Sequence, residues 1–247
     1  MPQMTESLLN GKRCFLEQKL WQKVMHSVIE EGLSSSIADR SDIVVGLLTF
    51  KSCIPGFFVD VTNLICIDPN PDIQVIEETA SRIRTLRQNF LDWYSRYQNV
   101  LSQCKELYPG SSEYDSHCKV FANYLSCNMI SSRLLAAISG KERAEVEKSV
   151  QELAGRMFLL EEEVKIASAQ TIMFMAQTLA VAKATMVTAE DWLVKDDVDD
   201  GLHGVRSENG LIERWKFEKW AKAFGRKMPE SEWELALDDG EPGRYNV

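Results

Sequence analysis

Three amide side chains lie within otherwise apolar helical patterns, where they could orient a bound molecule. Gln170 and Gln177 are seven residues apart in the uncharged segment 166–182, so a helix places both on one face together with Met173. Asn128 lies in a second apolar stripe. Buried amides need hydrogen-bond partners, which a ligand can supply or the amides can supply to one another. These residue types indicate recognition of a small apolar molecule by a few hydrogen bonds.

Two more side chains extend this candidate site. Tyr124 shares the apolar stripe of Asn128, one helical turn earlier. Arg133 precedes the apolar run 134–138 and is a candidate contact for an anion or a carbonyl group, with a surface ion pair as the alternative. The candidate ligand-binding residues are therefore Tyr124, Asn128, Arg133, Gln170, Met173 and Gln177.

A run of four aspartates around one valine, residues 196–200, is the most prominent local motif. It matches the DDxxD and DxDD patterns of terpene cyclases, in which clustered carboxylates bind Mg²⁺ and diphosphate or keep one carboxylic acid protonated. No second metal motif accompanies it, and Gly201 and Gly204 follow closely. A solvated acidic turn is the favoured interpretation.

Histidine and cysteine spacing indicates neither a metal site nor a nucleophile. His26, His117 and His203 are far apart and form no HxxxH or HExxH pair. No CxxC, GxSxG, GxGxxG or P-loop motif is present, so we expect no metal and no cofactor. Six scattered cysteines are typical of buried, reduced thiols in an intracellular protein: Cys14, Cys53, Cys66, Cys104, Cys118 and Cys127.

The segment 210–227 interleaves aromatic and basic residues. Such a pattern can bind nucleic acid, because basic side chains contact phosphates and aromatic rings stack on bases. The favoured alternative is a helix whose aromatics dock on the core while its cations complement the negative end of the helix dipole. This helix is also a candidate interface for a protein partner.

Composition favours one large soluble domain. The 247 residues are 45% hydrophobic, enough for a substantial core, and the net charge of −9 would repel nucleic acid and anionic membranes. The polar segment 1–11 lacks a signal-peptide core, and 166–182 is too short and polar to span a membrane. We therefore expect a cytoplasmic or nuclear protein with no direct nucleic-acid or membrane partner.

Apolar periodicity predicts helices along the N-terminal half of the chain. One helix is expected over 6–31, and two short helices, rather than strands, over 42–50 and 57–67. An aromatic-rich amphipathic helix is expected over 75–108 and another over 112–139, with a serine cap at 111 or 112.

The C-terminal half is expected to contain the centre of the fold. The pattern over 141–192 predicts one long helix, and its uncharged middle must be wrapped by other helices or line a cavity. A polar loop is expected over 196–210. The predicted fold class is all-α: a single helical domain, residues 1–237, packed around this long buried central helix, with a disordered tail over 238–247.

Several local sequences resemble the C-terminal helical regulatory region of fungal zinc-cluster transcription factors. The resemblance spans roughly residues 75–230 and is carried by SRLLAAI at 132–138, AVAKA at 180–184, GLIERW at 210–215 and GRKMP at 225–229. It implies an all-helical scaffold that senses or relays metabolite signals. The cysteine cluster that binds DNA in that family is absent, so no DNA-reading role transfers. A chain that starts at Met1 without this module suggests another purpose for the scaffold.

Three functions follow as hypotheses. The first is a stand-alone helical domain that binds a hydrophobic metabolite in an internal pocket between the helices of 75–108, 112–139 and 141–192. The second is a cofactor-independent biosynthetic enzyme that uses this pocket for a cyclisation, isomerisation or cycloaddition. The third is a transcription-associated interaction module. A central helix packed without any cavity would exclude the first two.

Overall fold

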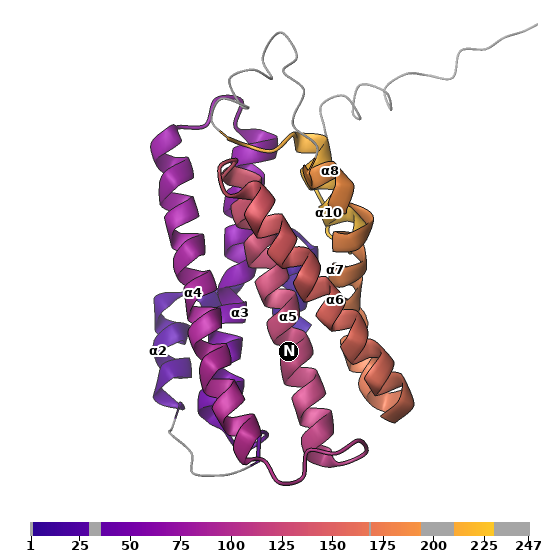
Figure 1. The fold of residues 1–247 in the computed structure, drawn as a ribbon. Coiled ribbons are helices and arrows are strands. Elements are labelled where there is room, and N and C mark those ends of the chain that lie inside the picture. Colours follow the sequence, from indigo (N-terminus) through magenta and orange to yellow (C-terminus); the bar gives the residue numbers. More distant parts are fainter. Residues whose placement is uncertain (1, 30–35, 168, 194–209, 230–247) are drawn as a thin grey trace, which may run out of the picture.

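The computed structural model describes residues 2–29, 36–167, 169–193 and 210–229. These residues form a bundle of helices and contain no strand, which confirms the predicted all-α class (Figure 1). The acidic run 196–200, most of the loop predicted over 196–210 and the tail predicted over 238–247 lie outside the described residues.

The helix α5, Ser112–Ile138, is the long buried helix at the centre of the bundle. It starts where predicted, because the side chain of Ser111 accepts a hydrogen bond from the backbone N–H of Tyr114 at 3.0 Å. Every residue from Tyr124 to Ile138 is buried, since helices α3, α4, α6 and α7 all pack against α5. The fold is thus built around α5.

The predicted central helix over 141–192 is instead three helices, and this corrects the sequence-based expectation. They are α6 (Arg143–Ala167), α7 (Ala169–Val187) and the short α8 (Ala189–Leu193). Helices α6 and α7 lie side by side as a hairpin (Figure 1). A straight helix over 141–192 would extend about 78 Å, well beyond its neighbours, with nothing to cover its apolar end.

The helix α4, Ile73–Gln103, confirms the amphipathic helix expected after Pro71. Its aromatic stripe is buried against α3 and α5, and the indole of Trp93 donates a hydrogen bond to the carbonyl of Ile43 at 2.8 Å. The Asp72 side chain caps the first turn by accepting from the backbone N–H of Gln74 at 2.8 Å. Helical spacing and a cap together specified this element.

The two short helices expected over 42–50 and 57–67 are one helix, α3 (Ser41–Thr62), continued by a π-helical turn, η2 (Asn63–Ile67). Pro55 lies inside α3 and leaves the carbonyl of Lys51 without its usual helical donor. Burial of most residues around Pro55 compensates for that loss. Ser41–Ile67 is long and apolar enough to cross a membrane, and half of its most apolar window is buried in the bundle.

The N-terminal segment predicted as one helix over 6–31 is divided. It forms α1 (Pro2–Leu9), a 3₁₀ turn η1 (Phe15–Glu17) and α2 (Lys19–Ser27). The break lies at Gly11, whose φ of +67° ends α1 in a left-handed conformation that suits glycine. Helices α1 and α2 both lie against α3.

The last described helix, α10 (Arg214–Ala223), confirms that the C-terminal aromatics dock on the core. Phe217, Trp220 and Phe224 are buried, and only Trp215 is exposed. After α10 the chain reaches α1: the backbone N–H of Lys227 donates to the carbonyl of Leu9 at 2.8 Å, and the guanidinium of Arg226 donates to the carbonyl of Leu8. We call this contact the terminal clasp.

Candidate functional site

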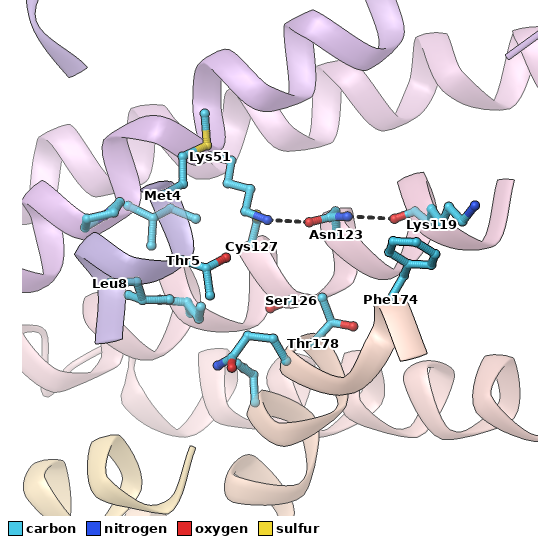
Figure 2. A pocket seen from close by; sticks show the side chains of 15 residues that line it. Met4, Thr5, Leu8, Lys51, Lys119, Asn123, Ser126, Cys127, Phe174 and Thr178 are labelled. Atoms are coloured by element: carbon cyan, nitrogen blue, oxygen red, sulfur yellow. Dashed lines mark hydrogen bonds between the residues drawn. The ribbon is translucent and has the colours of Figure 1, made fainter. Parts of the chain in front are cut away.

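A cavity of about 310 Å³ lies beside the central helix, between α1, α3, α5 and α7 (Figure 2). About half of its lining residues are apolar and include Met4, Leu8, Ile54, Ile130, Phe174 and Val181. Its polar lining residues are Thr5, Lys51, Lys119, Asn123, Ser126, Gln177 and Thr178. No aspartate, glutamate or histidine is among the described residues that line it.

Helical periodicity brings these residues to one place. On α5, Lys119, Asn123, Cys127 and Ile130 succeed one another at spacings of three or four residues, so they share the face turned to α1 and α7. The same spacing on α7 presents Phe174, Gln177, Thr178 and Val181. Helix α1 closes the cavity with Met4 and Leu8, both buried, and the terminal clasp holds α1 in place.

A row of polar residues forms one side of the cavity, which we call the polar edge: Lys51, Lys119, Asn123 and Ser126. The ammonium of Lys51 donates to Oδ1 of Asn123 at 2.5 Å. The amide nitrogen of Asn123 donates to the backbone carbonyl of Lys119 at 2.8 Å. Both bonds fix the Asn123 amide with its oxygen towards Lys51 (Figure 2).

The two lysines of the polar edge differ in position. Lys51 is half-buried and reaches into the cavity from α3. The ammonium of Lys119 lies 4.8 Å from the ring centroid of Phe174, an exposed residue at the outer end of the cavity. Neither lysine forms an ion pair with any carboxylate among the residues that the structure describes.

The remaining polar groups are partly satisfied by the protein. Thr178 donates its hydroxyl proton to the carbonyl of Met175 at 2.8 Å, and the Gln177 amide nitrogen donates to the carbonyl of Phe224 at 3.4 Å. The Ser126 hydroxyl, on a residue only 7% exposed, has no hydrogen-bond partner among the described residues. The hydroxyl opens to the cavity, where water or a bound molecule can be its partner.

Cys127 contributes apolar surface to the cavity. Burial raises the pKa of its thiol to about 11, with a smaller opposing effect of the nearby Lys51 charge. The thiol is therefore protonated at neutral pH, and a protonated thiol is a poor nucleophile.

Of the predicted site residues, Tyr124 and Asn128 are brought together but do not line the cavity. The Asn128 amide nitrogen donates to the Tyr124 hydroxyl at 3.3 Å, and its amide oxygen accepts from the Ser132 hydroxyl at 3.3 Å. Tyr124 also stacks on Tyr94, with ring centroids 4.7 Å apart. These hydrogen bonds are all made within α5, and the Tyr124 ring joins α5 to α4, so the pair is part of the core.

Arg133 is fully buried, which corrects the alternative of a surface ion pair. Its guanidinium pairs with both carboxylate oxygens of Glu147 on α6, at 2.5 and 3.0 Å. It also donates to the hydroxyl of Thr188 at 2.6 Å and the carbonyl of Thr185 at 2.9 Å, and it lies 4.4 Å from the ring of Trp192. With these partners it holds α5, α6 and the end of α7 together.

The three predicted residues of α7 do not share one buried face. Gln177 lines the cavity, Met173 is 76% exposed, and the Gln170 side chain lies outside the described residues. The expectation of an inward-facing Met173 is wrong because the chain reverses between α6 and α7. One side of the first turns of α7, which carries Met173 and Phe174, is therefore exposed, while Thr171 and Met175 on the other side are buried.

Sequence reasoning missed the polar edge and the contribution of α1. Lys119 and Asn123, four residues apart, look like a solvated helix face, and Lys51 is distant in sequence. The detectable signal was the interruption of the apolar pattern of α5 by Asn123 and Ser126. Among the described residues, no group of three or more His, Cys, Asp or Glu side chains is arranged to hold a metal ion.

Comparison of the chain with protein-family models, with curated proteins and with solved structures found no match. Fold and site therefore define the class of the protein: an all-α bundle with a cavity beside its central helix.

Proposed function

We propose that this protein binds a small, largely apolar molecule in the cavity between α1, α3, α5 and α7. The observation that carries the proposal is the cavity itself, about 310 Å³ in volume, whose lining combines apolar residues from all four helices with a row of polar groups. Ligand sites in proteins have volumes from about 300 Å³ upwards and the same combination of apolar walls with a few placed polar groups.

The position of the cavity differs from the sequence-based hypothesis. That hypothesis placed the pocket between 75–108, 112–139 and 141–192, whereas the cavity is lined by α5 and α7 together with α1 and α3, and by no residue of α4. The resemblance to regulatory regions of fungal zinc-cluster transcription factors supports a role in sensing a metabolite. Arg133 and Arg226, within the segments that carry this resemblance, hold the scaffold together around the cavity.

Binding is better supported than cofactor-independent catalysis. General acid–base catalysis needs a group that exchanges protons near neutral pH and reaches the substrate. The described cavity lining holds neither a carboxylate nor an imidazole, and the thiol of Cys127 stays protonated.

A neutral probe tests the proposal. Octan-1-ol is titrated into the protein labelled with ¹³C in its methionine methyl groups, and methyl NMR shifts are followed. We expect a saturable shift of Met4, which lines the cavity, and no shift of Met157, which is buried against other helices.

A blocking variant localises the site. Ser126→Phe places a ring in the cavity, and we expect it to abolish the Met4 shift. The matched control, Ser81→Phe on the exposed side of α4, should bind like the parent protein. Absence of a Met4 shift in the parent protein, or an undiminished shift in a folded Ser126→Phe variant, would contradict the proposal.

A further inference from the structure

The cavity carries positive charge that no described residue neutralises. Lys51 and Lys119 are its charged lining residues, and neither has an ion-pair partner in the described chain. Elsewhere in this acidic protein, with a net charge of −9, several arginines pair with carboxylates, whereas the buried Arg226 bonds to the carbonyl of Leu8 instead. Such pairs are Arg40 with Asp42, Arg84 with Glu142, Arg133 with Glu147 and Arg214 with Glu218.

The inner part of the polar edge presents hydrogen-bond donors. The ammonium of Lys51 has three protons and gives one to Asn123, which leaves two. Ser126 lies one turn after Asn123 on α5, and its hydroxyl proton is also unused by described residues. The Asn123 oxygen accepts from Lys51, and its nitrogen gives one of its two protons to the carbonyl of Lys119, which leaves one. Donors of this kind fit a group rich in acceptors.

The rest of the cavity fits an apolar chain of limited length. Met4, Leu8, Ile130 and Val181 form walls without charge. A volume of about 310 Å³ corresponds to roughly ten groups the size of a water molecule, at about 30 Å³ each. A molecule such as octanoate, with an apolar chain and one terminal anion, matches both the size and the polarity.

We infer that the ligand is an anionic amphiphile of about this size, whose terminal carboxylate or phosphate is bound by Lys51 and Ser126. Its apolar body then lies against α1 and α7. Charge-assisted hydrogen bonds of an ammonium to such a group are stronger than neutral ones. This inference rests on the proposed function and adds the chemical class of the ligand.

Lys119 has a different part in this site. Its ammonium lies over the exposed ring of Phe174 at the outer end of the polar edge, and it attracts the anion during entry. Attraction of this kind is screened by salt. Loss of the Lys119 charge therefore weakens binding less than loss of Lys51, and only at low ionic strength.

The test compares four ligands of one chain length: octanoate, octyl phosphate, octan-1-ol and octylamine. Affinities are measured by isothermal titration calorimetry and by the Met4 methyl shift. We expect octanoate or octyl phosphate to bind more tightly than octan-1-ol, and octylamine most weakly. The ratio of the first two affinities identifies the anion as a carboxylate or a phosphate.

Variants assign the anion contact. Lys51→Met should weaken binding of the preferred anion about tenfold or more, the loss of one charge-assisted hydrogen bond, and leave octan-1-ol unchanged. Ser126→Ala, which removes only a hydroxyl group, should also weaken binding of the anion. Lys148→Met, at an exposed lysine of α6, is the matched control and should change neither affinity.

The outcomes separate this inference from the proposed function. If octan-1-ol shifts Met4 while both anions bind no more tightly, or if Lys51→Met and Ser126→Ala leave anion affinity unchanged, the inference is overturned and the apolar site remains. If none of the four ligands shifts Met4, the proposed function fails and the inference fails with it.

Discussion

Two cations on the same bundle have opposite surroundings. Arg133 has a bidentate carboxylate, a hydroxyl, a carbonyl and a tryptophan ring around it, all from the protein. Lys51 has one amide oxygen and faces an open cavity. The partners of Arg133 hold helices together, whereas Lys51 still has hydrogen-bond donors that a ligand can use. The comparison teaches that an inward-facing cation indicates a binding site only when some of its hydrogen-bond donors have no partner within the protein.

The largest effect should come from breaking the Arg133 pair. Glu147→Ala leaves a fully buried guanidinium without its carboxylate. We expect a loss of about 3–5 kcal/mol in the free energy of unfolding, measured by chemical denaturation. A loss below about 1 kcal/mol would show that the pair does not hold α5 to α6.

Replacing the whole pair should restore much of that loss. In the double variant Arg133→Met, Glu147→Leu neither charge is left alone, and apolar replacement of a buried ion pair is often nearly neutral. We expect the free energy of unfolding to return to within about 2 kcal/mol of the parent protein. A double variant as unstable as Glu147→Ala would mean that the contacts to Thr185, Thr188 and Trp192 matter more than charge balance.

The same kind of change at Lys51 should alter stability less. Lys51→Met removes one charge-assisted hydrogen bond at a half-buried site, so we expect the free energy of unfolding to fall by about 1–2 kcal/mol. Anion affinity should fall in the same variant. Destabilisation as large as that of Glu147→Ala would show that Lys51, like Arg133, is structural.

A third basic group, His117, should have the smallest effect on the free energy of unfolding, and this effect depends on pH. Its ring contacts Tyr97, Tyr114 and Phe121, its Nδ1 lies 2.8 Å from the Tyr97 hydroxyl, and burial lowers its pKa below the ordinary 6.5. The unfolded chain therefore takes up this proton at higher pH than the folded protein.

We accordingly expect the free energy of unfolding to decrease as pH falls from about 6.5 towards the lower pKa of the folded state. His117→Phe should reduce this slope, and denaturation curves across that range measure it. Equal slopes in both proteins would assign the pH dependence to other groups.

The sequence predicted elements whose signal is local. Helix α4 has a continuous stripe from Ile76 to Val100, and α5 begins at a serine cap, so spacing alone located both. The all-α class followed from the same periodicity. Such features depend on residues within one or two turns of each other.

The site depended on contacts between distant segments. The uncharged run 166–182 shows that a helix is apolar but does not show which helices cover it, so the reversal between α6 and α7 was missed. Arg133 and Glu147 look unrelated in sequence because they belong to consecutive helices. The cavity combines α1, α3, α5 and α7, and only packing reveals that Lys51 faces Asn123.

The terminal clasp has a consequence for synthesis on the ribosome. Arg226 and Leu8, which it joins, are 218 residues apart. At about 5–20 residues per second, α1 emerges on the order of ten seconds or more before its partner exists. During this interval α1 can already lie on α3, but it lacks the bonds from Arg226 and Lys227 that later fix its end. The cavity lining is complete once α7 has been made, and the clasp forms after it.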